Sequence, residues 1–367
     1  MKIVCPQDEL LAKLQIAARG VSLRSTVQIL SGILIDAGEA GVELAATDME
    51  LSVRVPLPAA RVEEAGRTVV PGRLLVEIVR VLPPEDVVLE QAAGGGALRL
   101  TCGSSEYTLH TQSADDFPQI PLPGGERFTV DRAAFAETVA HVGRAASKDE
   151  SRPVLTGILV EFGDGTVTMA ATDSYRLSVK TAPLPGASGT AQAIVPARAL
   201  SEVTRIGAAL EGEGLEVAIG ENQVLMGVDG AWVSARRIDG QFPDYRRLRP
   251  GEFNHEVSIS KDELLDVIRR TALMAQRNAP LRLTFAEGSL TLAAQSQDIG
   301  EAKESLPVDF HGETMEIGFN PDFLRDGVDS VEGESVRLRL ISSLRPGLIQ
   351  GDGDEFWYLI MPIRLPS

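Results

Sequence analysis

The chain has 367 residues, of which 44% are hydrophobic, 5% aromatic and 24% charged, and its formal net charge is −17. This composition excludes a disordered or fibrous protein, and the length exceeds that of one ordinary hydrophobic core. With two cysteines, Cys5 and Cys102, no run of about 18 apolar residues and no signal-peptide pattern at the amino terminus, the sequence predicts a cytoplasmic protein without a disulfide framework.

In chain order, the spacing of apolar residues predicts six amphipathic helices, separated by short strands. The first helix follows from the spacing of Leu10, Leu14 and Ala17. The helices expected at 72–80 and 197–207 begin at Val-Pro-x-Arg motifs, because proline suits the first helical turn. The strands include the predicted hairpin of 157–162 and 166–171 around Gly163-Asp164-Gly165. The expected helices span about 8–19, 72–80, 131–145, 197–207, 261–273 and 320–328.

Several motifs recur at a spacing near one third of the chain. Gly32-Ile33-Leu34 returns as Gly157-Ile158-Leu159, Thr47-Asp48 as Thr172-Asp173, and Phe117-Pro118 as Phe242-Pro243, each 125 residues later. A fainter third copy follows at an offset of 123, as in Phe162 and Phe285. The repeats predict three copies of one α+β domain, with helices packed on antiparallel sheets. The expected domains are residues 1–121, 126–247 and 252–367, separated by proline- and glycine-rich connectors.

No pattern of catalytic residues stands out. The four histidines are far apart without the spacing of metal ligands, and no phosphate-binding loop or nucleophile motif is present. The sequence therefore predicts a protein with no catalytic residues, no metal and no cofactor. Charge is unevenly distributed, since the six predicted helices together carry +1 and the other residues −18.

The longest motifs resemble one known family. Ala171-Thr172-Asp173-Ser174-Tyr175-Arg176-Leu177, the segment 239–247, the segment 315–320 and the terminal segment 358–365 resemble the bacterial DNA polymerase III β subunit family, the sliding clamps, in order along the whole chain. The resemblance implies a non-enzymatic processivity factor, in which two protomers join head to tail as a ring of six domains around DNA.

An estimate of domain size is consistent with the implied ring. A domain of about 122 residues has a radius of gyration of roughly 14 Å. Six such domains leave a hole on the order of 35 Å, which admits a duplex about 20 Å wide, whereas three leave almost none. Lysine and arginine side chains on the ring's inner surface would then contact phosphates without reading the sequence. The positions implied for this contact are Arg24, Arg73, Lys148, Arg152 and Arg198.

The resemblance also implies a pocket between the second and third domains, which binds short peptide motifs of the replicative polymerase, the clamp loader and repair proteins. Aliphatic walls and a methionine suit Leu and Phe side chains, while Thr172, Arg176 and Arg247 would orient polar groups. This pocket is expected to be a feature that the other domain junctions lack. Its implied residues are Leu155, Thr172, Ser174, Tyr175, Arg176, Leu177, Pro243, Arg247, Leu248, Pro346, Leu359, Met361, Pro362, Ile363 and Arg364.

The homodimer contact is expected to join the third domain of one protomer to the first domain of the other. Its expected residues are Tyr107, Leu109, Leu273, Met274, Asp298, Glu301 and Glu304. The partners implied are thus double-stranded DNA, the peptide-bearing proteins and a second copy of the chain, with no membrane, and the protein is expected at the nucleoid during replication. Two alternatives stay open: a clamp-like paralogue that binds peptides without being loaded on DNA, and an enzyme whose site is assembled from distant residues.

Overall fold

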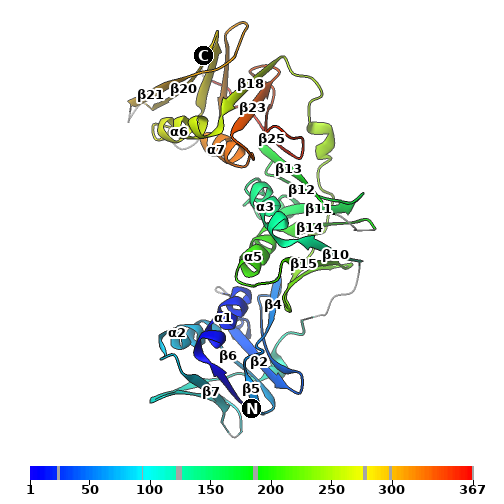
Figure 1. Ribbon diagram of the computed structural model, residues 1–367, viewed down its shortest axis with the longest axis vertical. Helices are drawn as coiled ribbons and strands as arrows, with labels where there is room; N and C mark the ends of the chain where they lie inside the picture. Colours follow the sequence, from blue (N-terminus) through cyan, green and yellow to red (C-terminus); the bar gives the residue numbers. More distant parts are fainter. Residues whose placement is uncertain are drawn as a thin grey trace. The chain divides into compact units, whose positions relative to one another are not determined.

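The computed structural model describes residues 1–22, 25–92, 94–120, 126–184, 189–275, 279–296 and 300–365 (Figure 1). They form two compact units, and the boundary between the units runs through the middle repeat. Unit 1 comprises Met1–Arg132 and Arg198–Arg237, and unit 2 comprises Ala133–Ala197 and Ile238–Ser367. The predicted Pro121–Gly125 connector lies outside the described residues.

Unit 1 contains two antiparallel sheets. The eight-stranded sheet has the order β10 (Glu126–Asp131), β15 (Gly214–Ile219), β16 (Gln223–Val228), β17 (Ala231–Arg236), β4 (Leu51–Pro56), β3 (Gly41–Thr47), β2 (Gly32–Gly38), β6 (Gly66–Pro71). The five-stranded sheet has the order β5 (Arg61–Glu64), β1 (Lys2–Pro6), β7 (Asp86–Gln91), β8 (Ala97–Cys102), β9 (Ser105–His110).

Unit 2 repeats this plan. Its eight-stranded sheet has the order β14 (Ala191–Pro196), β11 (Gly157–Gly163), β12 (Thr166–Thr172), β13 (Arg176–Pro183), β25 (Phe356–Ile360), β24 (Gly347–Gln350), β23 (Ser335–Leu340), β18 (His255–Ser260). The four-stranded sheet has the order β21 (Gly300–Pro307), β20 (Ser289–Ser296), β19 (Leu281–Ala286), β22 (Met315–Phe319).

Each eight-stranded sheet joins four strands of one repeat to four strands of the next. We call the β4–β17 pairing the first seam and the β13–β25 pairing the second seam. Ser52 lies opposite Ser234 at the first seam, and Leu177 lies opposite Leu359 at the second. Because backbone hydrogen bonds cross each seam, consecutive repeats share a sheet there.

The six predicted helices are confirmed. They are α1 (Gln7–Ala17), α2 (Gly72–Val81), α3 (Arg132–Gly143), α5 (Ala197–Ala208), α6 (Lys261–Ala272) and α7 (Pro321–Asp329), and a one-turn helix, α4 (Pro153–Thr156), was not predicted. Local sequence explains their starts: the Ser260 hydroxyl accepts a hydrogen bond from the Glu263 amide, and Asn320 caps α7 directly before Pro321.

The helices bury one face against sheets, as predicted for an α+β protein. In unit 1, α1 contacts α2, β3 and β4, and in unit 2, α6 contacts α7, β20 and β21 (Figure 1). Leu10 and Leu14 of α1 and Leu264 and Ile268 of α6 are buried. Among the described residues, no helix combines the length and apolar character that crossing a membrane requires.

Candidate functional site

A mainly apolar pocket lies at the second seam. Its volume is about 250 Å³, and all of its lining residues belong to the set expected from the sequence: Thr172, Ser174, Arg176, Leu177, Pro243, Leu248, Pro346, Leu359 and Met361. Leu177 and Leu359 form its buried floor, together with Trp357 and Tyr245 beneath them. Met361 and Leu248 are exposed at the rim. The structure thus brings these residues together, and their binding role stays a prediction.

The other residues expected at this pocket do not belong to its lining. Tyr175 is exposed, and the Arg247 Nε lies 2.8 Å from Asp244 Oδ2. The Ile363 amide donates to the Gly318 carbonyl at 2.7 Å, which attaches the terminal segment to the neighbouring sheet. Leu155 of α4 is half-buried, as are Pro362 and Ile363, and Arg364 is exposed.

Arg176 is held by the protein itself. Its side chain is only 10% exposed, its Nε lies 3.0 Å from Asp173 Oδ2 and its Nη1 lies 2.7 Å from Asp326 Oδ2. The guanidinium also stacks 4.2 Å above the centre of the Phe323 ring. With both carboxylates as partners, Arg176 fixes the pocket wall between β13 and α7 and has little remaining capacity to orient a ligand.

Thr172 is also engaged within the chain. Its hydroxyl donates to the Arg176 carbonyl at 2.6 Å and accepts from the Ser174 amide at 3.1 Å. Ser174 has a φ of 80°, in the left-handed region that residues other than glycine rarely adopt. Both residues thus hold this tight turn, and the expectation that they also orient ligand groups stays a prediction.

The residues expected to contact DNA are solvent-exposed where the structure describes them. Arg73 pairs with Glu77 at 3.0 Å, Arg198 pairs with Asp48 at 2.7 Å, and Arg152 pairs with Asp149 at 3.0 Å. Arg152 also donates to the Ser174 hydroxyl at 3.1 Å, beside the apolar pocket. Lys148 is exposed, and Arg24 lies outside the described residues.

The residues expected at the dimer contact occupy strands at sheet edges and the end of α6. Tyr107 on β9 is exposed, whereas the Leu109 side chain is buried in its own unit. Glu301 and Glu304 lie on β21, and the Glu304 carboxylate already accepts hydrogen bonds from Nε and Nη2 of Arg270, which lowers the pKa of Glu304. Leu273 is exposed, Met274 is half-buried, and Asp298 lies outside the described residues.

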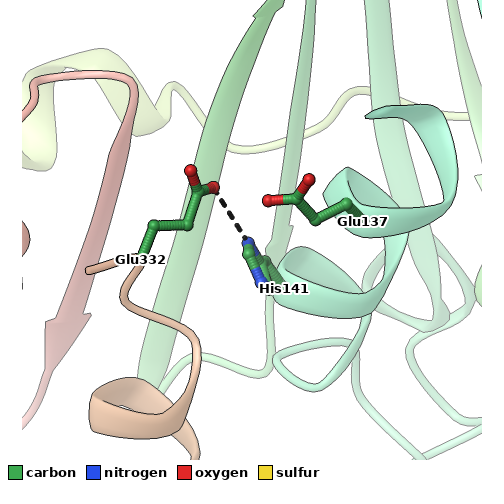
Figure 2. Close-up of side chains that lie close together, drawn as sticks. All are labelled: Glu137, His141 and Glu332. Atoms are coloured by element: carbon green, nitrogen blue, oxygen red, sulfur yellow. Dashed lines mark ion pairs between the residues drawn. The ribbon is translucent and has the colours of Figure 1, made fainter. Parts of the chain in front are cut away.

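A charged cluster that the sequence did not predict lies on the helix side of the second seam. Glu137 and His141 of α3 and Glu332 approach one another closely enough to hold a metal ion (Figure 2). The ammonium of Lys180 on β13 already fills this position: its Nζ lies 2.9 Å from Glu137 Oε1, 3.3 Å from His141 Nδ1, and it pairs with Glu332. Because Lys180 supplies the positive charge, a metal ion would have to displace it.

The same surroundings depress the basicity of His141. Burial lowers the pKa of His141 to about 4, and the Lys180 ammonium acts in the same direction. The hydrogen bond from Lys180 also lowers the pKa of Glu137. Glu137 and His141 lie one helical turn apart on α3, whereas Lys180 and Glu332 are distant from them and from each other in the sequence. The sequence therefore did not reveal the cluster, which forms only when Lys180 of β13 and Glu332 meet the helix in the folded unit.

The first seam carries a pocket as well. It has a volume of about 360 Å³ and a polar lining of Met49, Glu50, Ser52, Asn222, Gln223, Ser234 and Arg236. The expectation that only the junction of the second and third repeats forms a pocket is therefore wrong. The 125-residue repeat offset could have located this one, because Thr47-Asp48 precedes Met49 as Thr172-Asp173 precedes Ser174.

Comparisons with known proteins agree along the whole chain. Residues 1–121, 129–244 and 246–364 match the family models of the N-terminal, central and C-terminal domains of the DNA polymerase III beta subunit. The beta sliding clamps of Streptomyces coelicolor and Synechococcus elongatus are 36% and 34% identical, each covering 100% of both chains.

A solved structure shows the same likeness in three dimensions. The DNA polymerase sliding clamp from Bacillus subtilis is 27% identical, has a TM-score of 0.94, and covers 100% of both chains. The sequence identities of 36% and 34% extend over the full length, and the three domain models match in order along the chain. The likeness therefore goes beyond the fold. The chain belongs to the DNA polymerase III beta subunit family, the bacterial sliding clamps, which serve the replicative polymerase as accessory subunits without a catalytic site of their own.

Proposed function

We propose that the protein encircles double-stranded DNA as a head-to-tail homodimer and keeps the replicative polymerase on its template. The observation that carries this proposal is the match of three beta-subunit domains, in order, to a chain that repeats itself three times. Retention on DNA then depends on topology, so contact with phosphates need only be weak, sequence-independent and salt-sensitive. We also propose that the protein is found at the nucleoid during replication.

The strand pairing supports a specific mode of dimerisation. The strands at the two seams are the fourth strand of one repeat and the last strand of the next: β4 with β17, and β13 with β25. The corresponding strands β21 and β9 each pair on one side only within the described sheets. We propose that β21 of one protomer pairs with β9 of the other and forms a third kind of seam, since an unpaired edge favours such pairing.

Partner proteins are proposed to bind at the second-seam pocket. Its apolar floor suits Leu or Phe side chains of a short peptide, and a methionine at the rim adapts to both. The residues proposed to contact the peptide directly are Leu177, Pro346, Leu359 and Met361, while Thr172 and Arg176 hold the pocket in shape. The replicative polymerase, the clamp loader and repair proteins are the partners proposed for this site.

The ring is tested by retention on circular DNA. The labelled protein is loaded by a clamp loader on a nicked circular plasmid, and the complex is isolated by gel filtration and then linearised at a single site. We expect the protein to stay on the uncut circle and to leave the linear molecule. Equal retention on both forms would reject topological linkage, and peptide binding without any loading would favour the paralogue. A chain that stays monomeric by analytical ultracentrifugation at micromolar concentration would reject the dimer.

The DNA contacts have their own test. Replacing Arg73 or Lys148 by Ala is expected to lower the salt dependence of DNA binding by about one phosphate contact each, a slope change of roughly 0.9 in log K against log salt. Arg61→Ala, in an exposed pair with Glu63 on β5, serves as the matched control. If the slope of log K against log salt does not change, the replaced residue does not contact DNA.

A further inference from the structure

The pocket at the first seam has the same backbone frame as the apolar pocket at the second. The Thr47 hydroxyl accepts from the Met49 amide at 3.0 Å and donates to the Leu51 carbonyl at 3.2 Å, as Thr172 does with Ser174 and Arg176. Met49 has a φ of 77° and Ser174 has a φ of 80°. The same strained turn therefore opens both pockets.

The pairing across each seam continues this equivalence. The Arg236 amide donates to the Glu50 carbonyl at 3.1 Å, and the Met361 amide donates to the Tyr175 carbonyl at 2.8 Å. Ser234 lies opposite Ser52 as Leu359 lies opposite Leu177. Arg236 thus occupies the position of Met361, and Ser234 that of Leu359.

The side chains at these equivalent positions have opposite character. Ser52, Ser234 and Arg236 stand where the second seam has Leu177, Leu359 and Met361, and Gln223 stands where the second seam has Pro346. An apolar floor has been replaced by hydroxyls, an amide and a guanidinium. The first-seam pocket therefore cannot accept the aliphatic anchor that fits the second, and its ligand must be polar.

The Ser52 hydroxyl of the first-seam pocket lies 2.7 Å from the Thr47 hydroxyl, but four other polar side chains of the pocket have no partner within the described part of the chain. There, the Arg236 guanidinium, the side-chain amides of Asn222 and Gln223, and the Glu50 carboxylate make no hydrogen bond or ion pair. An arginine with no carboxylate partner in a chain of net charge −17 is notable, because most described arginines are paired with acids. Next to these groups, Met49 is 64% exposed.

We propose that the first-seam pocket binds a short acidic peptide segment of a partner protein. The guanidinium of Arg236 would pair with an Asp or Glu side chain of that segment, since arginine binds carboxylates through two parallel hydrogen bonds. The amides of Asn222 and Gln223 can both donate to and accept from a peptide backbone. Met49 offers an apolar contact to the residue beside the acid. One unpaired guanidinium suits one carboxylate, whereas binding of nucleic acid needs several basic side chains, and Arg236 is the one basic residue among the described residues that line the pocket.

This site goes beyond the proposed function, in which partners bind through apolar anchors at the second seam. A partner that carries an apolar motif and an acidic segment would be recognised at two points, which selects it over partners with the apolar motif alone. The site does not depend on ring formation or on loading, so its failure would leave those proposals unaffected.

The test uses the full chain and a defined probe, N-acetyl-aspartyl-leucinamide, followed by saturation-transfer NMR and titration. We expect binding to the wild-type chain, and binding about tenfold or more weaker to Arg236→Gln, because a charged hydrogen-bonded pair is lost. Arg236→Lys should retain part of the affinity. The asparaginyl analogue of the probe should bind the wild-type chain as weakly as the aspartyl probe binds Arg236→Gln.

Matched variants locate the probe. Met361→Ala, at the equivalent position of the second seam, should leave probe binding unchanged, and the unfolding midpoint of Arg236→Gln should equal that of the wild type because Arg236 is exposed. The proposal is overturned if the probe does not bind the wild-type chain, or if it binds Arg236→Gln as tightly as the wild type. It is also overturned if the asparaginyl analogue binds the wild-type chain as tightly as the aspartyl probe, or if Met361→Ala abolishes probe binding. Tighter binding of a single-stranded oligonucleotide than of the probe, dependent on Arg236, would overturn it in favour of nucleic acid.

Discussion

The two seams share a backbone arrangement but have opposite polarity on both faces of the sheet. At the first seam, Ile16 and Val55 are buried on the helix side and the pocket on the other side is polar. At the second seam, the equivalent positions 125 residues later are His141 and Lys180, which join a charged cluster, and the pocket on the other side is apolar.

This inversion shows which part of a repeat is fixed and which part varies. The turn and the strand pairing depend on backbone hydrogen bonds, on one threonine hydroxyl and on the next residue, an aspartate whose Oδ1 accepts two backbone amides at each seam. The two seams carry different side chains at the other positions of the turn. The side chains on either face can therefore change independently of the fold. A repeated domain gains distinct binding sites in this way without a change of architecture.

The largest expected effect comes from removing the ion pairs that the largely buried Arg176 side chain makes with Asp173 and Asp326 at the second seam. The first seam has Leu51 at the position of Arg176. Arg176→Ala leaves Asp173 and Asp326 without their main partner, and we expect a loss of about 3 to 5 kcal/mol in the free energy of unfolding. Urea denaturation followed by circular dichroism measures this loss. Arg269→Ala, which removes an exposed pair with Asp266, should change stability by less than about 0.5 kcal/mol. Similar values for both variants would contradict the structural role of Arg176.

The next effect separates the two pockets by their ligands. Met361→Ala should weaken a fluorescent peptide with a Gln- and Leu/Phe-rich motif by about 1 to 3 kcal/mol, because the rim contact is lost, while the dimer stays intact. Fluorescence anisotropy measures the affinity. Met49→Ala at the first seam is the matched control and should leave this affinity unchanged. Unchanged affinity in Met361→Ala would remove Met361 from the peptide site.

The charged cluster predicts a dependence of stability on pH. The folded-state pKa of His141 lies near 4, below the ordinary 6.5, so the unfolded chain binds more protons between these values and stability falls as pH falls through that window. We expect His141 to contribute a loss of about 2 kcal/mol between pH 7 and pH 5. His141→Gln should lose correspondingly less over the same interval in urea denaturation. Identical pH profiles for the two proteins would show that His141 does not titrate in this way.

The smallest effect tests what the seams share. Thr47→Val and Thr172→Val each remove a hydroxyl that both donates and accepts within the turn, and each should cost about 1 kcal/mol. The loss for Thr47→Val, measured by urea denaturation, should be equal to or larger than that for Thr172→Val by up to about 1 kcal/mol, because the Thr47 hydroxyl makes the same two hydrogen bonds as that of Thr172 and also lies 2.7 Å from the Ser52 hydroxyl. A clear loss in only one variant would mean that the turns are not energetically equivalent.

Much of the fold could be predicted from the sequence, because local patterns carry it. Apolar spacing located the six long helices, and Gly163-Asp164-Gly165 located the β11–β12 hairpin. The seams could not be predicted in the same way. β4 pairs with β17, about 180 residues away in sequence, and no local pattern specifies that partner.

The sites were predicted unevenly for a similar reason. The apolar pocket followed from a resemblance over several motifs, whereas the first-seam pocket was missed because polar residues such as Asn222 and Gln223 look like ordinary surface in a sequence. For Arg176, the sequence showed neither the burial of the side chain nor its ion pair with Asp326, on a helix 150 residues later. Charges that meet only through tertiary structure are the part that residue patterns do not reveal.

The edge strands β9 and β21 differ from each other, so a contact between their free edges would be heterologous: each protomer contributes β9 to one contact and β21 to the other. Such a contact does not limit the number of subunits by itself. If each domain turns the chain by about 60°, the assembly closes after two protomers, and a slightly different turn yields an open helical polymer. The number of subunits would then be set by the angle at every seam, and a substitution at the first or second seam could convert a closed particle into a fibre without altering either edge.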